Sequence, residues 1–216
     1  MKKSIANLDE IAEKLRAGLS ARDAVREKML PLSRDVIRYC SQAIRALHRQ
    51  EFREAEEMLG SASNLLVDIE KTVSGCDEML NTGAFRDAQK EYAEGRITLA
   101  VVRGKPVPDP DELKVDPAAY LNGMGEAVGE LRRYLLDKMR QGDLSRGEEL
   151  LSAMDDIYTV LVAMDFPDAI TGGLRRTTDN VRGILEKTRG DLTLAAQNRG
   201  LESKLNDFQK RLPPAP

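Results

Sequence analysis

The sequence predicts an all-α fold. Apolar residues recur at helical spacing in almost every segment of the 216 residues, and no stretch alternates as a half-buried strand would. Aromatic residues make up only 4% of the chain and charged residues 32%, which fits a helix-rich protein better than a β-sandwich. We therefore predict one single-domain bundle of about seven helices over residues 1–216, in which residues 1–20 and 191–216 form peripheral helices or tail.

The first half of the chain shows amphipathic segments separated by cap and turn residues. Ile5–Ala17 is a short helical piece, and Ser20 is placed to cap the next helix, ARDAVREKMLPLSRDVIRYCSQAIRALHR. Pro31 lies inside that helix and predicts a kink, because proline lacks a backbone donor. Two further helices are expected over Phe52–Thr72 and Ala84–Val102.

The second half begins with the stretch RGKPVPDPDELKVDP, whose prolines predict a loop without regular structure. Pro167 marks a second break, and a weaker, polar helix is expected at the end of the chain. The helices expected in this half cover Pro117–Arg140, Ser145–Ala163, Leu174–Arg189 and Asp191–Leu212.

Composition excludes several classes of protein. No apolar run approaches the roughly 20 residues that a membrane-spanning helix needs, so no membrane partner is expected. The two cysteines, Cys40 and Cys76, lie far apart without a CxxC motif, which argues against a zinc cluster and suggests a reducing compartment. We therefore expect a cytoplasmic protein. Its net charge of −3 means that any site for a polyanion must come from charge gathered on one face.

Four arginines mark one face of the long helix that contains Pro31. At about 100° per residue, Arg34, Arg38, Arg45 and Arg49 fall within a sector of roughly 60° opposite the apolar face, and His48 lies beside them. This arginine stripe is either the solvated side of the helix or a track for a phosphate backbone, whose oxygens suit the planar guanidinium. Few acids interrupt it, which favours the track slightly.

Two pairs of glutamates suggest a metal site. Glu91 and Glu94 are three residues apart and Glu126 and Glu130 are four apart, so each pair shares a helix face. Like charges at this spacing repel each other, and a divalent cation such as Mg²⁺, which prefers hard oxygen ligands, reverses the sign of that interaction. The alternative is that all four glutamates face solvent.

The helix that carries the second pair is unusually rich in glycine, which raises a related question. Gly123, Gly125 and Gly129 each weaken a helix interior by roughly 1 kcal/mol relative to alanine. They either leave space beside the acids for a ligand or serve only the close packing of helices. The sequence lacks the P-loop, GxGxxG, GxSxG and HExxH motifs. If the protein is an enzyme, its catalysis therefore depends on carboxylates and a bound metal ion.

Several segments, in order and with compatible spacing between Asp23 and Asp191, resemble the translin family, and TRAX (translin-associated factor X) in particular. EKMLPLSRDVIRYCSQAIRALHR resembles the first long helix of that family, and LRRTTDNVRGILEKTRGDL resembles the closing helix. QKEYAEG resembles its glutamate-bearing QEYxEA segment, and DPAAYLNGMGEAVGELRR resembles its DYLxGxxDxxGEL segment, with QGDL in place of a following NGDI-like stretch.

The resemblance implies an all-α endoribonuclease that depends on Mg²⁺ or Mn²⁺ and cleaves mainly single-stranded RNA inside an oligomeric, commonly octameric, shell. Glu91, Glu94, Glu126 and Glu130 match the acidic catalytic and metal-binding positions, with glutamate in place of aspartate at 126. The residues expected to hold nucleic acid are Arg34, Arg38, Arg45, His48, Arg49 and Lys90.

Two alternatives remain open from the sequence. The protein is either this nuclease or a non-catalytic, translin-like binder of single-stranded RNA or DNA in which the acids have no catalytic role. A structural helical protein without any nucleic acid is a third, weaker possibility. Retention of all four carboxylates favours the nuclease, because translin itself lacks the acidic set.

Overall fold

The computed structural model describes residues 7–211, and within this range it confirms the all-α fold class. Eight α-helices are present in that range, because two pairs of expected helices are each joined into one and the two predicted breaks each contain one helical turn. In chain order the elements are α1 (Leu8–His48), α2 (Phe52–Val73), the 3-10 helix η1 (Asp77–Asn81), α3 (Gly83–Val102), α4 (Pro110–Leu113), α5 (Pro117–Arg140), α6 (Gly147–Ala163), α7 (Asp168–Thr171) and α8 (Leu174–Arg211).

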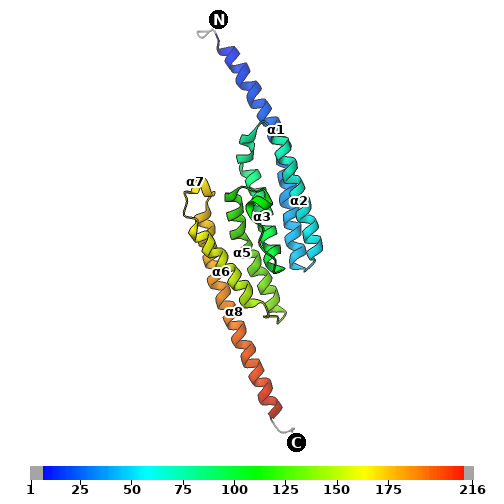
Figure 1. Ribbon diagram of the computed structural model, residues 1–216, viewed down its shortest axis with the longest axis vertical. Helices are drawn as coiled ribbons and strands as arrows, with labels where there is room; N and C mark the ends of the chain where they lie inside the picture. Colours follow the sequence, from blue (N-terminus) through cyan, green and yellow to red (C-terminus); the bar gives the residue numbers. More distant parts are fainter. Residues whose placement is uncertain (1–6, 212–216) are drawn as a thin grey trace.

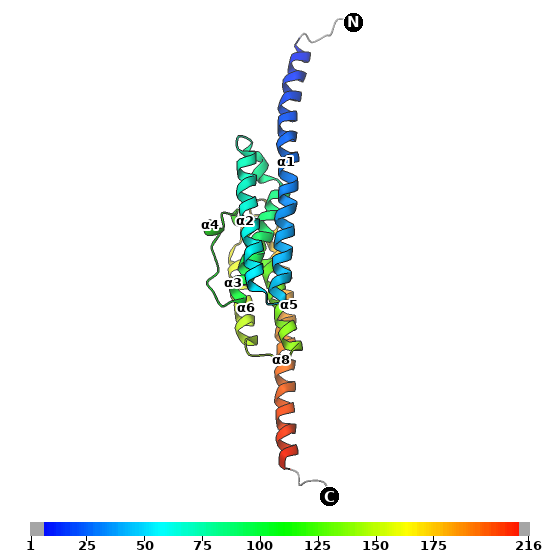
Figure 2. The same cartoon turned by 90° about the vertical axis from the view of Figure 1, so that its right-hand side faces the viewer.

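Both end helices are longer than the sequence predicted. The expected piece Ile5–Ala17 and the helix that follows it form one helix, α1, although Ile5 itself lies outside the described residues. Pro31 lies inside α1 and does not end it (Figure 2). The expected helix boundary at Ser20 was therefore wrong. Likewise, the polar segment predicted over Asp191–Leu212 continues α8 without a break as far as the structure describes it.

The helices pack in three layers (Figure 1). The α1–α2 hairpin covers one side of α3, the central pair α3 and α5 lie against each other, and α6 and α8 cover the far side of α5. The first turns of α1 and the last turns of α8 extend beyond this body in opposite directions (Figure 2). No helix of the described chain is long and apolar enough to cross a membrane.

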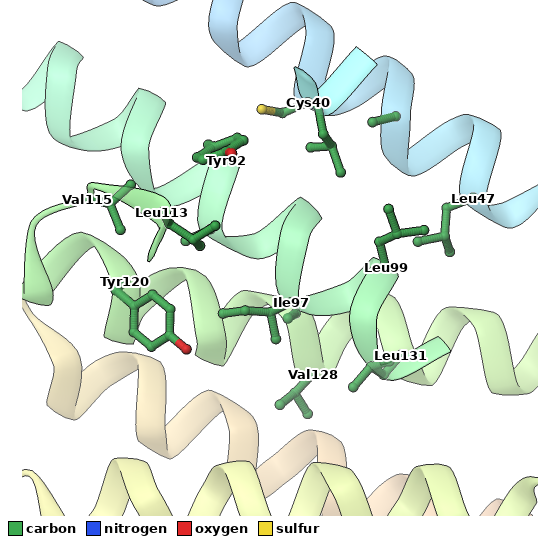
Figure 3. Close-up of a cluster of buried hydrophobic side chains, with 14 of the residues drawn as sticks. Cys40, Leu47, Tyr92, Ile97, Leu99, Leu113, Val115, Tyr120, Val128 and Leu131 are labelled. Carbon is green, nitrogen blue, oxygen red and sulfur yellow. The ribbon is translucent and has the colours of Figure 1, made fainter. Parts of the chain in front are cut away.

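Hydrogen bonds, including a helix-capping box, hold the proline-rich stretch in place. Asp109 accepts a hydrogen bond from the backbone N–H of Glu112, whose carboxylate accepts one from the backbone N–H of Asp109, and this capping box starts α4. The hydroxyl group of Tyr120 on α5 donates a hydrogen bond to the carbonyl oxygen of Pro108 at 2.8 Å. The loop therefore folds back over α3 and α5, and contributes Leu113 to the core (Figure 3).

The hydrophobic core draws on α1, α2, α3, α5, α6 and α8, and Figure 3 shows the part of it around α3. Cys40 and Leu47 project from α1 towards α3, and Ile97 on α3 is fully buried above Val128 of α5. Burying such aliphatic side chains stabilises a fold by roughly 1.5–3 kcal/mol each. This packing fixes the register of α3 against α5, which decides where the side chains on their polar faces meet.

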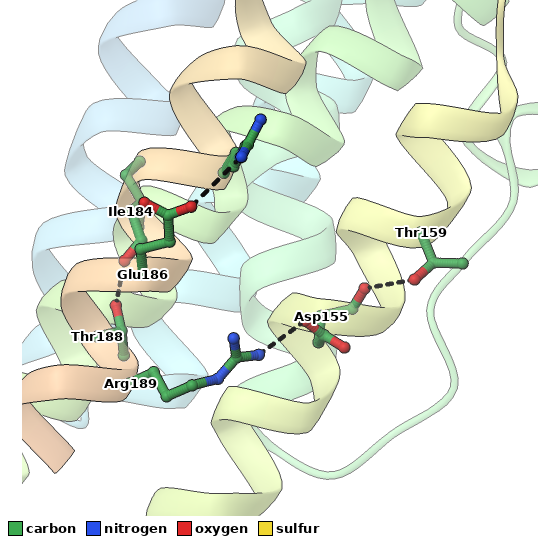
Figure 4. A network of polar contacts seen from close by, with 7 residues as sticks. Asp155, Thr159, Ile184, Glu186, Thr188 and Arg189 are labelled. Carbon is green, nitrogen blue, oxygen red and sulfur yellow. Dashed lines mark hydrogen bonds and ion pairs between the residues drawn. The ribbon is translucent and has the colours of Figure 1, made fainter. Parts of the chain in front are cut away.

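Polar contacts hold α8 to the rest of the bundle. Arg189 of α8 lies 3.1 Å from Asp155 of α6, both about half exposed (Figure 4). Arg132 of α5 donates to Thr188 at 2.9 Å and to Asp191 at 2.7 Å. The contacts of Arg132 place the middle of α8 beside the part of α5 that follows its glycines.

Candidate metal and nucleic-acid site

Three of the four predicted glutamates meet between α3 and α5. Glu91 and Glu94 project from α3 and Glu126 from α5, and one carboxylate oxygen from each lies within 4.8 Å of the others. We call these three residues the carboxylate cluster. Its members are all partly buried, unlike a set of solvated surface acids.

Close packing of α3 and α5 brings the cluster together. A Cβ atom on Gly123 would lie 2.5 Å from the carbonyl oxygen of Lys90 and 3.0 Å from the backbone nitrogen of Glu94. Gly125 is equally necessary on the other side of α5, where a Cβ would collide with the methyl group of Thr177 on α8. Gly129 is different, because the nearest atom to a Cβ there is 4.0 Å away. Two of the three glycines are thus explained by helix packing.

The electrostatics of the cluster favour a cation. Burial, together with the negative charges of Glu91, Glu126 and Glu130, raises the pKa of Glu94 to about 8. The pKa of Glu91 is also raised, first by burial and then by Glu126. A partly buried group of carboxylates either holds protons or binds a positive charge. The three carboxylates offer the hard oxygen donors that Mg²⁺ and Mn²⁺ prefer, so the residues fit such an ion.

Lys90 neutralises part of this charge. Its Nζ donates to Glu126 at 2.8 Å. Burial lowers the pKa of Lys90, but the hydrogen bond and charge of Glu126 outweigh that effect, so the pKa lies above its ordinary value. Lys90 is therefore a cation at the edge of the cluster.

Glu130, the fourth predicted glutamate, lies outside the cluster. Its carboxylate is 2.5 Å from Nε2 of His48 on α1 and 3.7 Å from Arg133. The side chain of His48 is only 7% exposed, and its Nδ1 is buried without a hydrogen-bond partner. His48 thus turns inward to hold Glu130 and does not extend the arginine stripe. Helical spacing placed His48 near the boundary of that stripe, and its contact with Glu130 of α5 shows that it faces inward.

The arginine stripe itself is exposed along α1. Arg38 pairs with Asp35 at 3.0 Å, and Arg49 pairs with Glu51 at 2.5 Å. Arg34 and Arg45 are exposed as well. The stripe is therefore accessible to a polyanion, and none of its residues belongs to the carboxylate cluster.

Two adjoining hollows open beside the cluster. The first, of about 420 Å³, is the carboxylate groove between α3, α5 and α8, and contains all three glutamates. The second, of about 670 Å³, is the flanking pocket, which lies between the start of α3, the start of α5 and the turn from α7 into α8. Glu126, Thr177 and Asn180 line both hollows, so the two share a border.

Residues of α8 at this border were not identified from the sequence. Thr177 donates to Asn122 of α5 at 2.7 Å, and Asn122 donates to the carbonyl of Thr171 at 2.8 Å. This network holds the start of α8 against α5. The Gly-Gly turn at Gly172 and Gly173 signals where α8 begins, but helical periodicity gives no indication of which helix faces the acids.

Comparisons with known proteins indicate the family. No family model matches the chain. A Methanocaldococcus jannaschii protein described as uncharacterised is 31% identical over 192 residues, which cover 88% of this chain and 85% of that protein. The crystal structure of AfC3PO is 33% identical with a TM-score of 0.78, and the match covers 87% of this chain and 98% of that one.

Two further solved structures agree with this match. AfC3PO in complex with duplex RNA is 31% identical with a TM-score of 0.76, over 87% of this chain and 97% of that one. Apo-NeC3PO is 18% identical with a TM-score of 0.74, over 89% and 99% of the two chains, and shows the shared fold alone. With more than 30% identity to AfC3PO over nearly all of that chain, and with the same all-α fold, this protein belongs to the translin family, which includes the C3PO proteins.

Proposed function

We propose that this protein is a TRAX-like, metal-dependent endoribonuclease that hydrolyses mainly single-stranded RNA. The observation that carries the proposal is the carboxylate cluster, three partly buried glutamates whose oxygens lie within 4.8 Å beside an open groove. The complex of AfC3PO with duplex RNA supports RNA as the ligand class. Duplex RNA and single-stranded DNA are further ligands to compare.

The residues divide the work as follows. Glu91, Glu94 and Glu126 would hold Mg²⁺ or Mn²⁺ through oxygen, and Glu130 adds negative charge near both α3 glutamates. A divalent cation held there would acidify a water molecule and neutralise charge on the scissile phosphate. Lys90 lies where it can donate to a phosphate oxygen at the edge of the cluster. Because phosphate contacts carry little sequence information, cleavage should be weakly sequence-specific.

The test is cleavage of a labelled single-stranded RNA in Mg²⁺ with and without EDTA. We expect Glu126→Gln to abolish metal-dependent cleavage while the protein keeps its assembly state, because glutamine keeps the shape but loses the charge. Glu148→Gln, at an exposed acid on α6, is the matched control and should cleave as the unaltered protein does. Unchanged metal-dependent cleavage by Glu126→Gln would contradict the assigned site.

One observation favours the second candidate, a non-catalytic binder of single-stranded RNA or DNA. The arginine stripe is exposed and shares no residue with the cluster, so it can hold a phosphate backbone without any metal. Tight, salt-sensitive binding without turnover in either Mg²⁺ or Mn²⁺ would establish this candidate and exclude the nuclease.

We also propose that the protein assembles as a homo-oligomer, an octamer as the family resemblance implies. The support is an apolar stripe on each projecting helix end. The exposed members are Leu8, Ile11, Leu15 and Leu19 on α1, and Leu194, Leu201, Leu205 and Phe208 on α8. An assembly of this kind would gather the arginine stripes of several chains and raise the local positive potential despite the acidic sequence.

A further inference from the structure

The flanking pocket has a size and a position that suit a ligand next to the carboxylate cluster. Its volume of about 670 Å³ falls within the range of roughly 300–1,000 Å³ that is usual for small-molecule sites. Because it meets the carboxylate groove at Glu126, Thr177 and Asn180, a chain that crosses the cluster enters the pocket next.

The pocket is lined by basic side chains, which can bind the phosphate of a nucleotide, and by acidic side chains, which can bind its hydroxyl and amino groups. Arg86 and Lys90 of α3 and Arg176 of α8 line it, and arginine binds phosphate oxygens in a bidentate way. Asp87 and Asp168 line the same pocket. Carboxylates repel a phosphate, but they accept hydrogen bonds from ribose hydroxyls and from the amino groups of bases. The mixture therefore fits a nucleotide better than a bare anion.

The backbone keeps the pocket open and fixed. Gly172 and Gly173 have φ values of +63° and +88°, which side chains rarely tolerate, so this wall carries no side chain. Asn122 is fully engaged, since it donates to the carbonyls of Ala118 and Thr171 and accepts from Thr177. The turn into α8 is thereby held against α5, and Arg176 extends from a positioned helix.

We propose that the flanking pocket holds the ribonucleotide adjacent to the scissile phosphate, with Arg176 and Arg86 on its phosphate group. The placement of this nucleotide next to a cleaved bond rests on the proposed nuclease function. The binding of the nucleotide in the pocket does not require catalysis. Arg175 provides a matched control. It neighbours Arg176 on α8, is exposed, lies 3.8 Å from Asp165, and lines a different surface hollow.

The experiment measures binding of a fluorescent single-stranded RNA to the full-length protein in EDTA, over a series of salt concentrations. We expect Arg176→Ala to weaken binding roughly tenfold or more. The slope of log affinity against log salt should become shallower by about 0.7, the value for one lost contact with a single strand. Arg175→Ala should change neither quantity. Mn²⁺ binding, followed by electron paramagnetic resonance, should be equal in both variants, because neither residue belongs to the cluster.

A second variant fills the pocket without removing charge. Gly83 lines the pocket and lacks a positive φ, and a Cβ atom on it would have no neighbouring atom within 4 Å. Gly83→Trp should therefore fold and weaken RNA binding. If Arg176→Ala and Gly83→Trp both bind RNA as Arg175→Ala does, the assignment of the pocket is wrong. If the unaltered protein binds RNA in this Arg176-dependent way but never cleaves it, the pocket stands and the nuclease proposal fails.

Discussion

At the level of single residues, the glutamates of α3 experience very different surroundings from those of an ordinary helix surface. Glu94 is partly buried against Glu91 and Glu126, and its pKa is raised to about 8 from a usual value of 4.5, mainly by burial. The native, metal-free protein therefore holds a proton on Glu94 over a pH range in which the unfolded chain has released it. A bound divalent cation would replace that proton, so metal binding and protonation compete.

This competition predicts how stability depends on pH. Between pH 4.5 and pH 8 the native state binds more protons than the unfolded state, so the contribution of Glu94 is fully present below pH 4.5 and is lost as the pH rises to 8. Glu94→Gln removes this dependence. Relative to the unaltered protein, its free energy of unfolding in EDTA should therefore rise by on the order of a few kcal/mol across the range. Urea denaturation at several pH values measures the difference.

Glu148→Gln serves as the control, since that exposed acid lies on α6 away from the cluster. Its unfolding curve should follow that of the unaltered protein at every pH. Saturating Mn²⁺ should flatten the pH dependence of the unaltered protein. Parallel pH profiles for Glu94→Gln and the unaltered protein would show that Glu94 is not held in a protonated form.

The spacing of the glutamates predicted which of them share a helix face, but not which meet across helices. Glu91 and Glu94 do join Glu126, whereas Glu130, one turn further along α5, pairs with His48. The distance between side chains on different helices depends on the register and separation of those helices, which no single segment encodes. For the same reason the sequence predicted a histidine beside the arginines and gave no indication that it points to Glu130.

At the level of elements, α5 shows why a helix accepts several glycines. Gly123 and Gly125 lie where α3 and α8 approach its backbone too closely for a Cβ, while Gly129 faces a wider space. The cost in helix propensity is thus offset by the burial of α5 between two neighbours. The carboxylate cluster depends on this approach, because it brings Glu126 of α5 to Glu91 and Glu94 of α3.

Alanine substitutions at these glycines should have opposite effects. Gly123→Ala places a Cβ 2.5 Å from a backbone carbonyl on α3, and overpacking of this kind typically costs about 1–3 kcal/mol. It should also weaken Mn²⁺ binding, because α3 and α5 must separate. Gly129→Ala meets only an ordinary contact at 4.0 Å, so it should stabilise the protein by up to about 1 kcal/mol. Urea denaturation measures both; equal stability of the two variants would contradict the close approach.

Helix positions were predictable from periodicity, and helix ends less so. The ranges predicted for α2, α3, α5 and α6 agree with the structure within a few residues. The breaks predicted near Gly18 and Gly190 were wrong, because neither glycine adopts a positive φ and the helix continues through both. Glycine permits a left-handed stop without requiring one. A loop was predicted over the proline-rich stretch, and the single helical turn α4, which depends on the side chain of Asp109 as its cap, was missed.

At the level of the whole molecule, the first described turns of α1 and the last described turns of α8 extend past the bundle, where no other described helix packs against them (Figure 2). Leu8, Leu15 and Leu19 on α1 are 48%, 61% and 63% exposed, and all lie on one face. An isolated helix of this length is marginally stable in water, and most helices gain their stability from packing of an apolar face. A second copy of the chain, with its own unpartnered stripe on α8, would cover this face.

Breaking the α1 stripe should therefore dissociate the oligomer and leave the bundle folded. For the unaltered protein, size-exclusion chromatography with light scattering should give the octamer, eight times the chain mass of 24.0 kDa. The double variant Leu15→Asp, Leu19→Asp should give a smaller species with unchanged helicity in the body, because a charge on each residue prevents burial of the stripe. Ala17→Asp, on the opposite face of α1, should keep the octamer. A full-sized assembly in the double variant would show that other surfaces hold the chains together.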